Sequence, residues 1–197
     1  LWTLPRAVAE VEAIRRALGL REVHLLGQSW GSAVAVEYAL THRGAGVRSL
    51  VLTGPFLSTP RWIADANVLV AGLPADVRRT IATADSTGRY DTPAYPECAQ
   101  VRGNDEIYRR MWGPSEFRAT GTLRDYDRTA RLAELRLPVL LVAGEHDSAR
   151  PETVRDYARR IPDARVVVVS GAGHAMVVDE PAVTVGAVRG FLREVER

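Results

Sequence analysis

A sharp strand-to-helix turn at residues 27–31 constrains the fold of this chain more than any other feature. The pentapeptide reads Gly-Gln-Ser-Trp-Gly and directly follows the apolar run Val23 to Leu26. A segment rich in Ala, Val and Leu then runs from about Gly31 to His42. Small residues on both sides of Ser29 let the backbone bend tightly, so the pattern predicts a strand, a turn and a helix in direct succession.

The same alternation recurs along the chain. Further apolar runs of the kind found in strands buried on both faces lie at 47–52, 138–144 and 165–169. Helices are predicted for residues 4–18, from Pro151 onward and for 181–195. Strands that alternate with helices in this way predict a parallel α/β sheet flanked by helices.

One stretch interrupts the alternation. Residues 57–122 contain several prolines and short helix-like pieces but no strand-like run. At 197 residues and 46% hydrophobic content, the chain suits a single sizeable core. We therefore expect residues 1–56 and 123–197 to form the two parts of an α/β core, with residues 57–122 as a helical insertion between them.

Charge and cysteine content narrow the possible partners and location. The chain has 26 cationic residues, all of them Arg, against 24 acidic ones, which leaves a net charge of +2. So small a surplus provides no broad field for nucleic acid or an anionic membrane, and the apolar runs are far too short for a membrane span. The single Cys98 excludes an internal disulfide and fits a reducing compartment, so a cytoplasmic location is expected.

Three residues are placed as a nucleophile, an acid and a base. The turn lifts the hydroxyl of Ser29 above the sheet, and the helix N-terminus beside it favours developing negative charge. Asp147 and His174 each follow a predicted strand, at the sheet edge where α/β folds place their sites. The chain order Ser, Asp, His matches that of α/β-hydrolases. This predicts a catalytic triad with the backbone N–H of Trp30 as an oxyanion donor. The alternative is a glycine-rich turn with an incidental serine.

Other residues compete for the acid and base roles. Glu145 could replace Asp147, although it lies closer to the end of its strand. His146 is interpreted as a loop neighbour, His24 as a packed strand residue and His42 as a helix-capping residue.

A different chemistry has little support in the sequence. Cys98 could in principle be a nucleophile, but no strand-to-helix turn surrounds it. No spacing of His and carboxylate residues resembles a zinc site, so neither a metal nor an organic cofactor is implied.

Several segments together resemble one known family. Residues 27–32, 111–117, 120–127 and 173–174 are similar to the proline iminopeptidase (prolyl aminopeptidase) branch of the α/β-hydrolases, and the likeness extends over essentially the whole chain. The stretch Met-Trp-Gly-Pro-Ser-Glu-Phe at 111–117 is the most specific of them. The resemblance implies an α/β-hydrolase fold with a helical cap over the active site.

The resemblance also suggests how substrate is held. In this branch the Glu of the 111–117 stretch holds the free amino terminus of a short peptide, which assigns that role to Glu116 and makes Trp112 a second substrate-binding candidate. A carboxylate suits a protonated amine because it forms charge-assisted hydrogen bonds with it. Alternatively, Glu116 pairs with Arg118 on the surface of the cap.

The chain departs from the family pattern in three places. Ser148 follows Asp147 where members of the branch often carry a second acid. The branch has an N-terminal segment with several strands and a loop that supplies a second oxyanion donor, and the chain, which begins at Leu1 without Met, has no counterpart of it. The cap is expected to be shortened near Val101 and Arg102. We therefore expect an incomplete sheet with one exposed edge, completed by a missing segment or a second chain.

The function expected from these features is that of a serine hydrolase of the aminopeptidase type. It would remove N-terminal proline, or another small apolar residue, from short peptides. One alternative is an amidase or esterase acting on small amino-acid derivatives. Another is a catalytically silent α/β-hydrolase domain that binds a partner through its exposed sheet edge.

Overall fold

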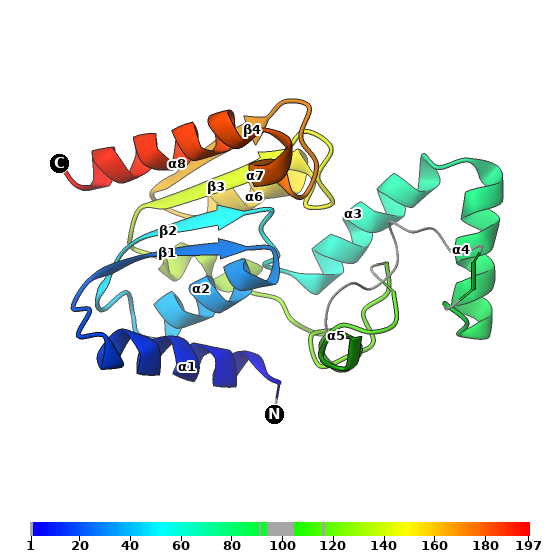
Figure 1. Cartoon of the computed structure of the whole chain (residues 1–197), viewed down its shortest axis with the longest axis horizontal. Coiled ribbons are helices and arrows are strands. Elements are labelled where there is room, and N and C mark those ends of the chain that lie inside the picture. The colour runs from blue at the N-terminus through cyan, green and yellow to red at the C-terminus, as the bar shows by residue number, and fades with distance from the viewer. Residues whose placement is uncertain (1, 91, 94–104, 116) are drawn as a thin grey trace. The chain divides into compact units, whose positions relative to one another are not determined.

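The computed structural model describes residues 2–90, 92–93, 105–115 and 117–197 (Figure 1). The chain forms two compact units, an α/β unit made of residues 3–58 and 127–197 and a helical unit made of residues 59–126. Within the described ranges, none of the helices has the length and apolar character needed to cross a bilayer.

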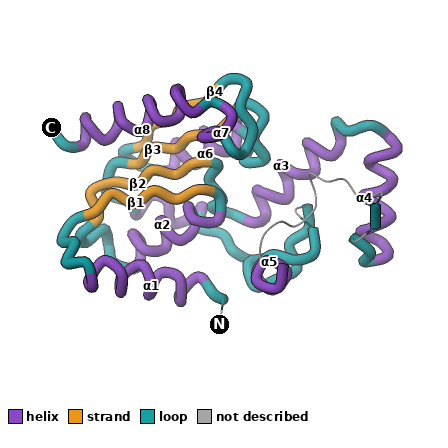
Figure 2. Tube along the Cα trace, viewed as in Figure 1, coloured by secondary structure: helices purple, strands orange, loops and turns teal. Residues whose placement is uncertain are grey.

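The α/β unit contains a parallel sheet of four strands in the order β1-β2-β3-β4 (Figure 2). Its strands are β1 (Val23–Gln28), β2 (Val47–Thr53), β3 (Val139–Gly144) and β4 (Ala164–Val169). Its helices are α1 (Leu4–Ala17), α2 (Trp30–Thr41), α6 (Pro151–Arg160), α7 (Met176–Asp179) and α8 (Pro181–Val195), with a 3₁₀ helix at Thr129–Glu134. The predicted fold class, a parallel sheet flanked by helices, is confirmed.

The helical unit contains α3 (Thr59–Ala71), α4 (Ala75–Thr87) and α5 (Asp105–Met111). Ile81 and Ala84 are its buried apolar centre in α4, and partly buried residues pack around them. The sequence predicts a helical insertion over 57–122, and the unit found in the structure runs from Thr59 to Tyr126.

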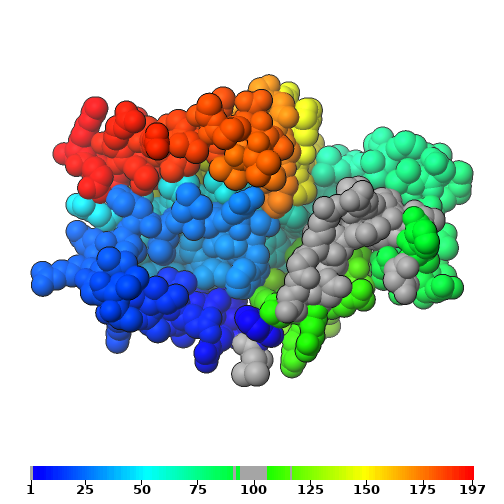
Figure 3. All heavy atoms as spheres, in the orientation of Figure 1, coloured from blue at the N-terminus to red at the C-terminus, as the bar shows by residue number. Residues whose placement is uncertain are grey.

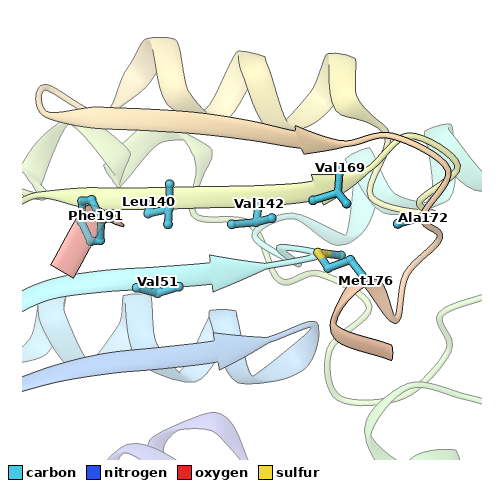
Figure 4. Packing of buried hydrophobic residues seen from close by; sticks show 7 residues of the cluster. All are labelled: Val51, Leu140, Val142, Val169, Ala172, Met176 and Phe191. Atoms are coloured by element: carbon cyan, nitrogen blue, oxygen red, sulfur yellow. The ribbon is translucent and has the colours of Figure 1, made fainter. Parts of the chain in front are cut away.

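The core of the α/β unit joins segments from both halves of the chain. Helix α8 packs on one face of the sheet, where buried side chains of β2, β3 and β4 meet residues of α8 and α7 (Figure 4). These residues are Val51, Leu140, Val142, Val169, Ala172, Met176 and Phe191. Each fully buried Val, Leu or Phe side chain contributes roughly 1.5–3 kcal/mol to folding. In the space-filling view, the orange-red surface of the C-terminal part adjoins the medium-blue surface around β1 (Figure 3).

Strand β1 differs from the central strands in its exposure. Every residue of β3 is buried, whereas most of β1 is half-buried or exposed and Leu26 is 62% exposed. Among the described strands, β1 pairs only with β2. It is therefore an edge strand in this sheet.

A partly buried carboxylate links helix α1 to helix α2. Glu12 of α1 accepts a hydrogen bond from Arg15 Nε at 3.0 Å and another from the hydroxyl of Tyr38 in α2. Arg15, Tyr38 and Arg16, in that order, hold the pKa of Glu12 well below its usual range. The charged form of Glu12 is thus favoured in the folded chain.

The Glu12→Gln variant is expected to lower the thermal unfolding midpoint at pH 7, and the loss should shrink as the pH falls. The pKa of Glu12 is lower in the folded than in the unfolded chain. Its contribution is therefore fully present above the unfolded pKa of about 4.3 and is lost as the pH falls further. Thermal unfolding of both proteins between pH 3 and 7 tests this. Glu10→Gln, which removes the exposed ion pair with Arg6, is the matched control and should change little at any pH. A Glu12→Gln deficit that stays constant with pH would contradict the prediction.

Candidate active site

The turn between β1 and α2 holds Ser29 in a strained backbone conformation. Its φ of 52° and ψ of −121° are unusual for a residue with a side chain, and of the described non-glycine residues only Ser29 and Arg43 have positive φ. Such a conformation costs on the order of 1–3 kcal/mol and persists only where the surrounding structure holds it. The Ser29 N–H donates to the Thr53 carbonyl at 2.9 Å, which ties the turn to the end of β2.

Two neighbours make this turn possible. A Cβ on Gly27 would lie 2.3 Å from the Gly31 carbonyl oxygen, so only glycine fits where the strand and helix meet. The buried hydroxyl of Ser32 donates to the Ser29 carbonyl and accepts from the Phe56 N–H at 2.8 Å. Ser32 was not predicted as a site residue, although a serine at the start of an otherwise apolar helix is a signal that points to it.

Asp147 and His174 meet at the carboxyl ends of β3 and β4. His174 Nδ1 lies 2.7 Å from Asp147 Oδ1, and Asp147 is almost fully buried while 35% of the His174 side chain is exposed. The Ala149 N–H also donates to Asp147 Oδ1, at 2.8 Å. A histidine whose Nδ1–H donates to a carboxylate uses Nε2 as its basic nitrogen, so this pairing suits a general base.

The loop that carries His174 reaches the Ser29 turn. The side-chain amide of Gln28 donates to the His174 carbonyl at 3.4 Å, a long hydrogen bond. The candidate nucleophile and base are therefore carried by neighbouring loops at one end of the sheet.

The ring of His174 lies against the backbone of Gly54, just after β2. A Cβ on Gly54 would lie 2.7 Å from His174 Cε1, 2.8 Å from Nδ1 and 3.2 Å from Asp147 Oδ2. Gly54 also has a φ of +52°, which disfavours other residues. No role was predicted for Gly54 from the sequence. A glycine directly after a buried strand, at the edge where the site is expected, was the available signal.

Trp30 is the first residue of α2, and 37% of it is exposed. The first N–H groups of a helix lack an i−4 acceptor and can bind an anion, and in α2 the Ser32 N–H already donates to the Ser29 carbonyl at 2.9 Å. This geometry suits the predicted oxyanion role of Trp30, which stays a prediction.

The structure gives the rival residues other contacts. Glu145 Oε2 accepts from Ser170 Oγ at 2.7 Å and from the Gly171 N–H at 2.9 Å, instead of bonding the His174 ring as Asp147 does. His24 and His42 also have partners of their own. His24 bonds Ser49 Oγ at 2.7 Å and Glu196 Oε1 at 2.8 Å, and the His42 ring lies 4.4 Å from that of Tyr38.

Trp112 lies within the helical unit and is buried. Its Nε1–H donates to the Ser115 carbonyl at 2.9 Å, and its ring meets Trp62 edge-on with centroids 6.2 Å apart. Arg118, the alternative partner of Glu116, forms an ion pair with Asp85 at 3.4 Å.

Other positions named from the sequence, Glu116, Cys98 and the segment at Val101 and Arg102, lie outside the described residues. Their predicted roles stay predictions. In the part of the chain that the structure describes, no three His, Cys, Asp or Glu side chains are grouped to hold a metal ion.

Comparison with known proteins gives consistent results. A family model described as the alpha/beta hydrolase fold matches residues 2–181. The chain is 34% identical to the proline iminopeptidase of Heyndrickxia coagulans, over 99% of this chain and 75% of that protein. It is 33% identical to the proline iminopeptidase of Lactobacillus delbrueckii subsp. lactis, over 92% and 69%.

Solved structures agree with these matches. A crystal structure of proline iminopeptidase from Mycobacterium smegmatis superposes with a TM-score of 0.86 at 31% identity, covering 98% of this chain and 72% of that one. The crystal structure of VinJ superposes with a TM-score of 0.88 at 27% identity, covering 99% and 74%.

Proposed function

The chain belongs to the proline iminopeptidase branch of the α/β-hydrolase family, serine hydrolases of the aminopeptidase type, and we propose that it removes N-terminal proline or another small apolar residue from short peptides. Ser29 is the proposed nucleophile, His174 the base and Asp147 the residue that orients the base. The observation that carries this proposal is the 2.7 Å hydrogen bond that buried Asp147 accepts from His174 Nδ1, on a loop that contacts the strained turn of Ser29.

The first half of the proposed reaction forms an acyl-enzyme. Ser29 Oγ attacks the scissile carbonyl carbon while its proton passes to His174 Nε2. Asp147 keeps Nδ1 protonated and stabilises the imidazolium that forms. The Trp30 N–H donates to the oxyanion, and the tetrahedral intermediate collapses when His174 returns the proton to the leaving amine.

The second half releases the acyl group. Water takes the place of the departed amine and loses a proton to His174 Nε2 as it attacks the ester carbonyl. The bond to Ser29 Oγ then breaks, and His174 returns the proton to the serine. The products are a free amino acid and a peptide one residue shorter, so no oxidant, reductant or cofactor takes part.

Selectivity for a free amino terminus tests whether the substrates are peptides with an unblocked N-terminal residue. The protein should hydrolyse prolyl p-nitroanilide at least about 10-fold faster, in kcat/KM, than N-acetyl-prolyl p-nitroanilide. A charge-assisted hydrogen bond to the amine is worth about 1.5–3 kcal/mol, which corresponds to 10-fold or more. Alanyl p-nitroanilide serves to measure the preference for the side chain.

The other outcomes distinguish the alternatives. Equal or faster turnover of the N-acetyl substrate, or of amino-acid esters alone, would replace the peptidase proposal with an amidase or esterase. An absence of turnover on every substrate would favour a catalytically silent binding domain.

Other parts of the expected function are predictions that this test leaves open. They are the amine-binding role of Glu116, the substrate-binding role of Trp112, the cap role of the helical unit and the cytoplasmic location expected from a single cysteine.

A further inference from the structure

We infer that Glu145 is a positioning residue that holds the His174 loop in its working place, an inference that rests on the proposed function. Glu145 follows β3, and the His174 loop, defined here as residues 170–175, follows β4. Because Asp147 and Glu145 leave the same strand end, one loop supplies both the orienting acid and a second carboxylate with a different task.

The contacts of Glu145 are directed at the beginning of the His174 loop. Its Oε2 atom accepts two hydrogen bonds, from Ser170 Oγ at 2.7 Å and from the Gly171 N–H at 2.9 Å. Gly171 has a φ of +72°, so the loop turns sharply at the point where the carboxylate holds it. These two bonds also hold the pKa of Glu145 below its usual value, the Gly171 N–H having the larger effect. The acceptor is therefore ionised at neutral pH.

The backbones of the two loops run in close contact beyond this point. The N–H groups of Glu145 and His146 donate to the carbonyls of Val169 and Ala172, each at 2.9 Å. A Cβ on Gly144 would lie 2.2 Å from the Gly173 carbonyl oxygen, so the loops have no room for a side chain between them. A shift of the His174 loop at its beginning is thus transmitted toward His174.

A second carboxylate holds the other end of the same segment. Asp179 Oδ2 accepts from the Gly173 N–H, the residue before His174, at 2.9 Å. The loop is therefore fixed at Gly171 by Glu145 and at Gly173 by Asp179. Without Glu145, the loop would lose its side-chain contact at Gly171 and keep the contacts further along, at Gly173 and His174. A displacement of about 1 Å at a reacting group can cost 10²-fold in rate.

The test compares Glu145→Ala with Glu145→Gln. A single glutamine oxygen can accept both hydrogen bonds, because the carboxylate uses only Oε2 for them. Turnover of prolyl p-nitroanilide is expressed per serine labelled by a fluorophosphonate at completion, so that misfolded protein is not counted. We expect Glu145→Ala to lower kcat by about 10-fold or more with KM changed less than about 2-fold, and Glu145→Gln to restore most of the loss.

Glu194→Ala is the matched control, since Glu194 pairs with Arg165 on the surface and touches neither loop in any described contact. An unchanged kcat in Glu145→Ala would overturn the inference. An equal loss in both Glu145 variants would also overturn it, because the loss would then depend on the charge of residue 145 and not on its hydrogen-bond acceptor.

Hydrogen exchange at the Gly171 amide gives a readout independent of turnover. It should be faster in Glu145→Ala than in the unmodified protein. An inactive unmodified protein would refute the proposed function. An unchanged exchange rate of the Gly171 amide in Glu145→Ala would instead refute the inference that Glu145 holds the His174 loop.

Discussion

In the Ser29→Ala variant, kcat for prolyl p-nitroanilide is expected to fall by about 10⁶-fold, the scale found when a serine nucleophile is removed from a triad. Covalent labelling by a fluorophosphonate should stop entirely, because the probe needs the hydroxyl oxygen as its point of attachment. Stopped assays at high enzyme concentration measure the residual rate, and intact mass measures the labelling. Binding of substrate should persist, since alanine removes only one oxygen atom.

Two further variants make the result interpretable. Ser86→Ala removes an exposed hydroxyl of the helical unit, which bonds only the Thr83 carbonyl in the described contacts, and should retain full labelling. Ser29→Gly should be as inactive as Ser29→Ala yet at least as stable as the unmodified protein, because glycine relieves the strain of the 52° φ at this position. Full labelling of Ser29→Ala, at whatever residue, would remove Ser29 from its assigned role.

Local pattern was sufficient to predict most of the fold. Strands β3 and β4 are nearly continuous apolar runs, and helix α8 begins at Pro181 and ends at Val195, as its periodicity and opening proline indicate. Strand β1 was predicted to end at Leu26 but extends to Gln28. The last two residues carry no apolar signal, and they are strand because they pair with Leu52 and Thr53 of β2. Pairing across a sheet is invisible to a local pattern.

The same limit explains which site residues the sequence revealed. Ser29 has a motif of its own, and Asp147 and His174 are conspicuous because each follows a strand in the order the fold requires. Gly54 and Glu145 have no such motif. Both act through contacts with distant segments. Gly54 lies against the ring of His174, and Glu145 accepts a hydrogen bond from the Gly171 N–H. A sequence therefore reveals candidate catalytic residues more readily than it reveals the residues that position them.

Gly54→Ala is expected to lower kcat/KM for prolyl p-nitroanilide by about 100-fold while leaving a folded protein. The added Cβ would lie 2.7 Å from His174 Cε1 and 2.8 Å from Nδ1, distances that real Cβ atoms do not tolerate. Strand β2 ends directly before Gly54, and the Gly54 N–H donates to the Val142 carbonyl at 2.8 Å, so the backbone is held and the imidazole is the group that moves. A displacement of about 1 Å of a base relative to its nucleophile costs on the order of 10²-fold.

Gly54 differs from most glycines in having both a close neighbour and a positive φ, and a matched variant separates the two effects. Gly19 has a φ of +64° but no atom near the position of an added Cβ, so Gly19→Ala introduces backbone strain without a collision. Gly19→Ala should lower the thermal midpoint and leave kcat/KM unchanged, whereas Gly54→Ala should lower both. Equal kinetic losses in the two variants would assign the effect to strain in general. A Gly54→Ala variant with unchanged kcat/KM would mean that His174 does not act as the base from its position against Gly54. That result would contradict the catalytic arrangement proposed for Asp147 and His174.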